Sequence, residues 1–517
     1  MDEQENAELA PMLATPERRL YAALFQPGVT YQYTRFAILR LLGLVYFVAF
    51  ASAFFQLPAL IGDDGLLPAK DYLHWLVRER GAMGSFLHLP SLFWLVGTSD
   101  VALRVTCALG AVMSLGVAFG ATNAVVQLAL WMLYMSVAHL GQVFYGYGWE
   151  AQLLETGFLS IFLCPLATLR PLPPRPPPVV VVWLFRWLIV RIMLGAGLIK
   201  LRGDACWTDL TCLYWHYETQ PVPSPVSWLL NQAPHGFQKV SVLYNHLVEL
   251  VAPFFAFAPA RARNVAGVLF VSFQIILIVS GNLSFLNWLT LVPALACFDD
   301  RALGRFFPRR VRDRKLAPVS RNHELTARGL AFVVALLSVM PIANLLSPSQ
   351  EMNTVYEPLR LVNSYGAFGS VEKERFELIL EGTRDEVPGA LTEWREYQLP
   401  CKPGDVTRRP CVITPYHYRL DWQMWFAAMS TYDDEPWIVH LVYQLLRGDR
   451  GPKTLLAVDP FPDAPPRWIR IERYRYTMTR LGERDWWHRE PAGEYLHAVS
   501  KDDPDLIEFV ADNGWTL

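Results

Sequence analysis

Charged and titratable side chains occur inside stretches of this sequence that are otherwise apolar. Such side chains can form buried ion pairs, line a polar cavity, or exchange protons during a reaction. An arginine at the centre of a membrane helix costs roughly 2.5–3.5 kcal/mol on insertion scales, so it needs a partner or water. We therefore treat seven residues as a candidate intramembrane polar cluster: Glu150, Glu155, Arg186, Arg191, Lys200, His246 and Glu249.

Two interpretations of this cluster stay open. In the simpler one, Glu150 and Glu155 pair with the two arginines, and these ion pairs fix the packing of the helices. In the other, the cluster lines a buried cavity that holds a ligand or carries out a reaction. Lys200 lies near the end of its apolar stretch, where a lysine can also extend its ammonium group toward water.

The elements that position these residues are apolar segments of membrane-spanning length. Only 18% of the 517 residues are charged and the mean hydropathy is +0.20, against roughly 25% charged residues in a soluble protein. A helix rises about 1.5 Å per residue, so about 20 apolar residues cross a hydrocarbon core of about 30 Å. We predict an α-helical polytopic bundle of about nine transmembrane helices, at 36–61, 101–120, 123–145, 151–169, 179–201, 240–258, 265–281, 283–298 and 329–346.

Positive charges in the connections predict the side on which each lies. Arginines precede the first span, and arginines with one lysine fill the connection 299–328 before the ninth. Such basic segments stay in the cytoplasm. The sequence therefore predicts a cytoplasmic segment 1–35, a bundle 36–347, and an extracytoplasmic domain 348–517 on the same side as an outer loop 202–239.

Residues 348–517 contain no apolar run of span length. Aromatic and β-branched residues in partial alternation predict strands at 375–381, 393–399 and 468–478. Helices are predicted at 437–446, after Pro436, and at 503–514, with Pro504 in the first turn. We expect a strand-rich α+β domain.

The seven cysteines divide by location. Three lie in apolar segments, where a thiol acts as a small apolar filler: Cys107, Cys164 and Cys297. The others form two near pairs on the side where disulfides persist, Cys206 with Cys212 and Cys401 with Cys411. Bridging within each pair is favoured over four free or cross-paired thiols. Neither pair has the C-x-x-C spacing of redox enzymes.

No motif of a soluble enzyme competes with this interpretation. The sequence has no Gly-rich phosphate loop, no H-E-x-x-H and no G-x-S-x-G. His216 with Glu218, and His417 with Asp421, are isolated pairs that indicate a metal or acid–base site only weakly, so no metal and no cofactor are predicted. No basic array indicates nucleic acid. Asn282 begins a formal glycosylation sequon, but it lies between two predicted spans.

Five long stretches, rich in Trp, Cys and Pro, resemble the lipase maturation factor family. The resemblance extends from about residue 36 to 487 and is highly specific, because long shared phrases of these residues are improbable by chance. The stretches are 147–165 (YGWEAQLLETGFLSIFLCP), 191–220 (RIMLGAGLIKLRGDACWTDLTCLYWHYETQ), 280–300 (SGNLSFLNWLTLVPALACFDD), 362–369 (VNSYGAFG) and 401–428 (CKPGDVTRRPCVITPYHYRLDWQMWFAA).

This resemblance implies a membrane protein of the endoplasmic reticulum that helps secreted lipases, such as lipoprotein lipase, to fold and assemble as dimers. The protein would then be a maturation factor and not a lipase. On this reading the outer loop 202–239 and the C-terminal domain face the client, and membrane lipid surrounds the bundle. The Ala-, Arg- and Pro-rich composition also suits a bacterial homologue in a cell inner membrane, with these parts in the periplasm.

A more distant resemblance keeps an enzyme as the alternative. The phrase 197–201 (GLIKL), with Asp204 and Trp207 after it, is similar to the transmembrane core of vitamin K-dependent γ-carboxylase. In that family a lysine at the matching point acts as a base, and the matching lysine here is Lys200. Desolvation can bring a lysine into the working range of a general base.

Overall fold

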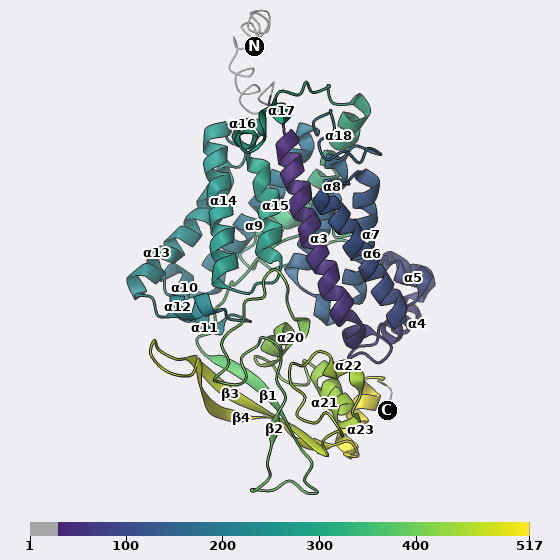
Figure 1. Ribbon diagram of the computed structural model, residues 1–517, viewed down its shortest axis with the longest axis vertical. Coiled ribbons are helices and arrows are strands. Elements are labelled where there is room, and N and C mark those ends of the chain that lie inside the picture. The colour runs from purple at the N-terminus through teal and green to yellow at the C-terminus, as the bar shows by residue number, and fades with distance from the viewer. Residues whose placement is uncertain (1–28, 516–517) are drawn as a thin grey trace, which may run out of the picture.

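The computed structural model describes residues 29–515 as a helical bundle with a small β-sheet domain at one end. The sheet and the helices that accompany it lie below the bundle in Figure 1, whereas the connection that holds α16 (Asp300–Leu303) and α17 (Arg309–Arg312) lies at the opposite end. The outer-loop helices α10 (Ala205–Thr208), α11 (Leu213–Thr219) and α12 (Pro225–Asn231) lie between the bundle and the sheet.

Within residues 29–515, five helical segments are long and apolar enough to cross a membrane. They are α3 (Gln32–Ile61), α6 (Asp100–Phe119), α9 (Val179–Gly203), α14 (Ala260–Ser280) and the consecutive pair α18 (Arg321–Leu337) and α19 (Val339–Leu346). Helix α9 is central, because 72% of its most apolar window is buried, compared with 33% for α6 and α14. The protein is therefore a multi-pass membrane protein.

The other four predicted spans form shorter or interrupted helices, so the count of nine is not confirmed. Three are shortened: α7 (Ala124–Leu140), α8 (Gly148–Leu163) and α15 (Leu286–Ala294). The predicted span 240–258 is not one continuous α-helix, because α13 (His235–His246) passes into a π-helical turn, η2 (Leu247–Val251), and then a 3-10 turn, η3 (Ala252–Phe255). Pro253 follows the π turn and has no N–H for an α-helical bond.

Two local contacts position helix α3 within the bundle. Asp300 caps the first turn of α3, since its carboxylate accepts from the backbone N–H groups of Gln32 (2.8 Å) and Tyr33 (2.7 Å). Helices α3 and α6 pack closely at Gly43, where a Cβ would lie 2.6 Å from the backbone N of Ala118. The remaining elements are α4 (Ala69–His88), α5 (Phe93–Val96), η1 (Gln142–Tyr145), η4 (Leu295–Cys297) and η5 (Gly304–Phe306).

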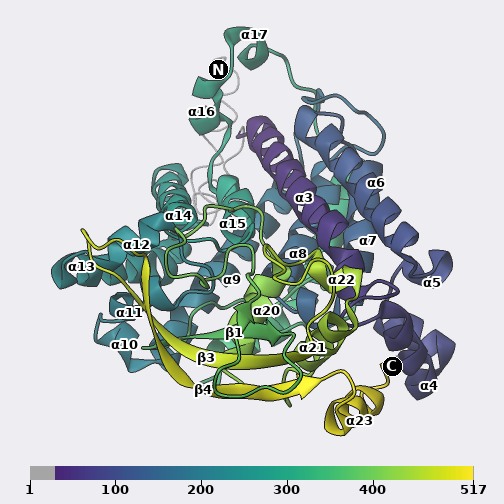
Figure 2. The same ribbon diagram turned by 60° about the horizontal axis from the view of Figure 1, so that its bottom comes forward.

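The C-terminal domain is built on a four-stranded antiparallel sheet in the order β2-β1-β3-β4. Figure 2, in which the sheet comes forward, shows α20 between the sheet and the bundle helices. The strands are β1 (Arg375–Thr383), β2 (Arg395–Glu396), β3 (Trp468–Met478) and β4 (Trp487–Ser500), and the helices are α20 (Arg419–Ala427), α21 (Trp437–Arg447), α22 (Arg450–Lys453) and α23 (Pro504–Asp512).

The expected strand-rich domain is confirmed, but three of its elements, β4, α20 and α22, were not predicted from the sequence pattern. The predicted strands 375–381 and 468–478 correspond to β1 and β3, and both predicted helices form, as α21 and α23. The predicted strand 393–399 is reduced to the two residues of β2. Strand β4 was not predicted because it contains Pro491 and Gly493; it lies at the edge of the sheet, where a missing N–H is tolerated.

The positions of the basic connection and the sheet suit the predicted topology. The two lie at opposite ends of the bundle (Figure 1). This is expected, because one predicted span, 329–346, separates them along the chain. Most of the predicted cytoplasmic segment 1–35 lies outside the described residues. The side on which each end lies remains a prediction.

We expect a membrane-impermeant thiol reagent to distinguish the two ends in intact membranes. In a variant whose native free thiols are replaced, a cysteine at Asp385 should be labelled from the extracytoplasmic side, whereas a cysteine at Arg312 should be labelled only after the membrane is made permeable. Both positions are in exposed segments, so burial does not explain a difference. Labelling of Arg312→Cys alone, in sealed vesicles whose extracytoplasmic face is outward, would show that the topology is the reverse of the predicted one.

Candidate functional site

Glu150, in the first turn of α8, binds an arginine of the C-terminal domain. Its Oε1 accepts from Arg419 Nη1 at 2.9 Å and from Trp149 Nε1 at 2.9 Å, and its Oε2 accepts from the Tyr134 hydroxyl. Glu150 and Arg419 are both fully buried. The expected pairing of Glu150 with Arg186 or Arg191 is therefore wrong, because the C-terminal domain inserts its own cation into the end of the bundle nearest the sheet.

Arg419 is enclosed by groups from three parts of the bundle. Its Nη1 also donates to the carbonyl of Phe144 at 2.7 Å, and its guanidinium carbon lies 3.3 Å from the centroid of the Tyr145 ring. The Gln56 side chain on α3 accepts from the backbone N–H of Arg419 at 2.8 Å. The start of α20 is thus held against α3 and α8 at the same time.

Glu155 and Arg191 form the second buried ion pair, and it also involves the C-terminal part of the chain. Glu155 Oε2 accepts from the backbone N–H of Asn363 (3.0 Å) and the Tyr365 hydroxyl (2.7 Å), while Arg191 Nη1 donates to the Asn363 carbonyl (2.6 Å). Gly195, one turn after Arg191, has no Cβ that would collide with the Tyr365 carbonyl. The pair therefore holds the segment 361–369 against α8 and α9.

Lys200 pairs with Glu249 near the end of α9 that precedes the loop 202–239. Its Nζ lies 2.6 Å from both carboxylate oxygens and 3.1 Å from Asn245 Oδ1, and it is 5.0 Å from the centroid of the Trp207 ring. Glu249 is on the π-helical turn η2, a type of turn that is frequent at functional sites. His246 is not part of the pair, because its Nε2 lies 3.0 Å from the carbonyl of Trp207.

Arg186 does not bind a carboxylate among the described residues. It donates through Nε to the carbonyl of Ala296 (2.8 Å) and through Nη2 to the hydroxyl of Tyr31 (2.8 Å). The seven residues of the predicted cluster therefore do not form one site. Four of them form two separate pairs, Glu155 with Arg191 and Lys200 with Glu249, and the other three have partners outside the cluster.

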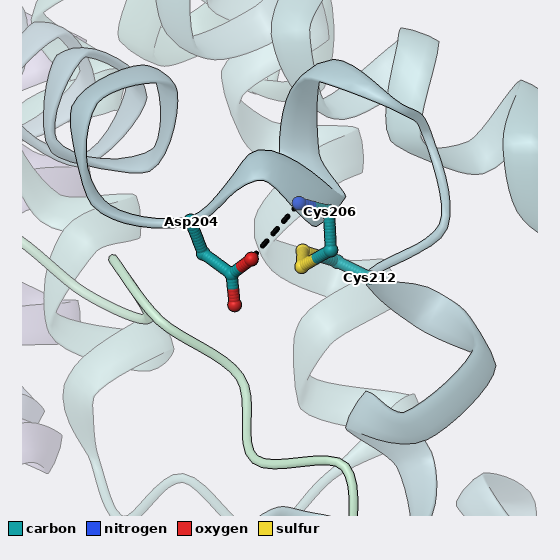
Figure 3. Close-up of side chains that lie close together, drawn as sticks. All are labelled: Asp204, Cys206 and Cys212. Carbon is teal, nitrogen blue, oxygen red and sulfur yellow. Dashed lines mark hydrogen bonds between the residues drawn. A yellow bond between two sulfur atoms is a disulfide. The ribbon is translucent and has the colours of Figure 1, made fainter.

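The disulfide Cys206–Cys212 follows directly after α9, the helix that carries Lys200. Figure 3 shows Asp204 beside it: one carboxylate oxygen accepts from the N–H of Cys206 at 2.9 Å. Asp204 and the two sulfurs are spaced as metal ligands are, but metal binding needs thiolates and both sulfurs are in the disulfide. The second pair, Cys401 with Cys411, is also bridged.

The two isolated histidine–carboxylate pairs do not form sites. His417 Nδ1 bonds Ser284 Oγ at 2.9 Å, and burial lowers the pKa of His417 well below its ordinary value. Asp421 instead accepts from the backbone N–H groups of Cys401 and Lys402 (both 2.7 Å), and burial raises its pKa to about 6. Burial also lowers the pKa of His216 to about 4, and Glu218 accepts from the N–H of Met478 at 2.7 Å.

The sequence analysis did not identify Arg419, and it also missed the contacts of Arg375 and Asn282. Arg375 on β1 donates to the outer-loop carbonyls of Glu218 (2.9 Å) and Pro221 (3.0 Å). Asn282 donates to the carbonyl of Cys411 (2.9 Å) and accepts from the N–H of Ile413 (3.0 Å), so its role is structural. One signal could have indicated the role of Arg375. Arg375 and Glu377 are two residues apart and so lie on the same face of a predicted strand, as a buried pair of opposite charges would, and both are buried.

The outer loop is only partly buried. Val222 and Trp228 are 1% and 8% exposed, whereas Leu229 and Phe237 are each 52% exposed, so the expectation that this loop faces a client stays a prediction. Trp228 Nε1 donates to Thr479 Oγ1 at 3.3 Å, immediately after β3. The Pro-rich aromatic segment in this loop packs against the chain's own C-terminal domain.

We expect Glu150→Gln and Arg419→Met to weaken docking of the C-terminal domain non-additively. Each single change leaves the other polar group buried without its partner, which costs about 3–5 kcal/mol, and the double change removes both. Thermal unfolding in detergent and limited proteolysis should show less loss for the double variant than for the two single variants summed. Glu490→Gln, at an exposed ion pair with Arg475, is the control; strictly additive losses would contradict the coupling.

Comparison with known proteins is consistent with both parts of this structure. A family model described as the lipase maturation factor transmembrane domain matches residues 33–305, and one described as the lipase maturation factor C-terminal domain matches residues 361–497. No solved structure matches the chain.

Full-length relatives agree. Lipase maturation factor 1 of Bos taurus is 50% identical over 505 residues, covering 92% of this chain and 90% of that protein. The Homo sapiens protein of the same name is 48% identical, covering 94% and 91%. Lipase maturation factor 2 of Gallus gallus is 30% identical, covering 92% and 82%. This chain belongs to the lipase maturation factor family.

Proposed function

We propose that this protein assists the folding and dimer assembly of secreted lipases from within the membrane of the endoplasmic reticulum, or from a cell inner membrane if the source is bacterial. The observation that carries the proposal is about 50% identity to proteins named lipase maturation factor 1 across both the bundle and the C-terminal domain. The clients would be lipases of the lipoprotein lipase type.

The two disulfides support a non-cytosolic position for the C-terminal domain. Cys206–Cys212 and Cys401–Cys411 both belong to the end of the bundle that carries the sheet. Disulfides persist in oxidising compartments and are rare in the cytosol. That end would face the lumen, or the periplasm in a bacterium, where a secreted client folds.

The connection between β1 and β2 is the apolar surface best placed for a client. Val387 is 78% exposed and Leu391 is fully exposed, and the connection extends from the sheet away from the bundle (Figure 1). An exposed apolar segment on the far side of the sheet from the bundle can contact apolar surface that an unassembled lipase has not yet buried. The buried middle of the outer loop contributes indirectly by supporting the sheet.

We expect the double substitution Val387→Ser and Leu391→Ser to reduce client maturation several-fold without lowering the amount of this protein. The test uses cells that lack their own maturation factor and secrete a lipoprotein lipase, and it measures secreted lipase activity per amount of lipase made. Leu481→Ser, which removes a leucine of 67% exposure on the other hairpin, is the matched control. Full client activity with the double variant would exclude this connection as the contact.

The enzyme alternative has one observation in its favour. Lys200 forms a buried pair with Glu249, which lies on a π-helical turn. A lysine that acts as a base must first lose a proton, and here its Nζ donates to a carboxylate and to Asn245. This arrangement equally suits a structural ion pair. The two functions differ in whether client maturation needs the amine of Lys200.

The double variant Lys200→Met with Glu249→Gln separates these functions. It removes the amine without leaving a buried carboxylate unpaired, which Lys200→Ala alone would do. If the protein is a folding factor, client activity should stay near the parental level. Loss of client activity from a variant that retains its unfolding temperature would instead favour a lysine-dependent reaction.

A further inference from the structure

A cavity of about 450 Å³ lies where the bundle meets the C-terminal domain. Its walls come from α8, α9, α11, α14 and α15 of the bundle, from the segment 352–372, and from α20. This volume is within the range of about 300–1,000 Å³ that is usual for small-molecule sites. Lys200, Arg186 and Arg191 do not line it, so the cavity is separate from the buried cations described above.

Most of the wall is apolar. Ile192 and Met193 of α9 and Phe273 of α14 line it from the bundle, and Trp422 and Phe426 of α20 line it from the C-terminal domain. At the opening, Met352, Phe426 and Met429 are 45%, 37% and 42% exposed. Flexible methionine side chains at an opening adapt to ligands of different shape. The cavity therefore suits a largely apolar molecule that enters from the junction of the two domains.

The inner end carries amide side chains with unused hydrogen-bonding capacity. Asn287 Nδ2 donates to Gln274 Oε1 at 2.8 Å, and Gln152 Nε2 donates to Thr290 Oγ1 at 3.0 Å. All four residues line the cavity and are at most 5% exposed. Within residues 29–515, Asn287 Oδ1, Gln274 Nε2 and Gln152 Oε1 have no protein partner. These three atoms are therefore free to bond a ligand in the cavity.

The charge of the lining selects against anions. Among the residues that line the cavity, the only charged side chains are Glu249 and Glu372, with no lysine or arginine. Glu249 is already neutralised by Lys200. A fatty-acid carboxylate or a phosphate headgroup would therefore lack a cation and approach carboxylates, whereas a hydroxyl or ester group can both accept from and donate to amides.

We propose that this cavity binds one uncharged acyl lipid whose headgroup carries hydroxyl or ester groups, such as a monoacylglycerol or diacylglycerol. The headgroup bonds Gln274, Asn287 and Gln152, and the acyl chain runs along the apolar wall toward Met352 and Met429. Because the walls come from both domains, the lipid contacts the bundle and α20 at once. The proposal does not depend on the identity of any client.

The first test uses the purified full-length protein and a 1-oleoylglycerol analogue with a photoreactive diazirine in its chain. We expect crosslinks in peptides of α9, α14 and α20, and at least tenfold better competition by 1-oleoylglycerol than by oleate, which has the same chain and a charged head. Competition by 1,2-dioleoylglycerol distinguishes a two-chain membrane lipid from a one-chain product. Crosslinks confined to the lipid-facing helix α6, or equal competition by oleate, would overturn the proposal.

Substitutions of the amide side chains that line the cavity test their role directly. The double change Gln274→Met and Asn287→Leu keeps the volume and replaces both members of a hydrogen-bonded pair, and it should lower specific labelling at least tenfold. The matched control is Gln127→Met with Ser160→Ala, which removes a buried amide–hydroxyl pair (3.0 Å) away from the cavity. Ala196→Phe fills the cavity from α9 and should also abolish labelling. Unchanged labelling in a folded Ala196→Phe variant would refute the site even if the amide variant does not fold.

Discussion

The ion pair between Glu150 and Arg419 is the interaction on which the arrangement of the two domains depends. Both side chains are completely buried, and they come from positions 269 residues apart. Desolvating two charges offsets most of their attraction, so such a pair contributes little net stability, but leaving either one unpaired costs about 3–5 kcal/mol. Only a docked C-terminal domain supplies both partners. The pair therefore selects one docking geometry, and every contact across the junction depends on that geometry.

Docking of the C-terminal domain at this pair explains why segments of the outer loop and of the chain near Cys411 are held by buried hydrogen bonds. Arg375 bonds the outer-loop carbonyls, and Asn282 bonds the backbone next to Cys411. Each contact satisfies backbone groups that would otherwise be buried and unpaired, a cost of about 1–3 kcal/mol per group. The two disulfides constrain the loops on either side of this junction. The exposed apolar connection between β1 and β2 is then carried on a rigid body instead of a flexible tail.

Local patterns in the sequence were enough to predict elements but not their partners. Hydropathy located α3, α6, α9 and α14, and alternation located β3 with its observed bounds, because each signal is contained within the element. The pairing of Glu150 was not predictable, since nothing local to α8 indicates a cation on α20. The π turn that carries Glu249 was also missed, because its apolar composition is the same as that of an α-helix. Strand β4 was hidden by Pro491 and Gly493, which an edge strand tolerates.

Helix α9 makes several separate contacts along its length. Fourteen residues separate Arg186 from Lys200, which is a rise of about 21 Å along a helix, so its cations lie at three depths. Arg186 bonds backbone and tyrosine near one end, Arg191 holds the segment 361–369, and Lys200 neutralises Glu249 at the other end. Between these cations, Ile192 and Met193 leave an apolar wall facing the cavity. Because these cations are all engaged elsewhere, no lysine or arginine lines the cavity, and neutral amides supply most of its polar groups.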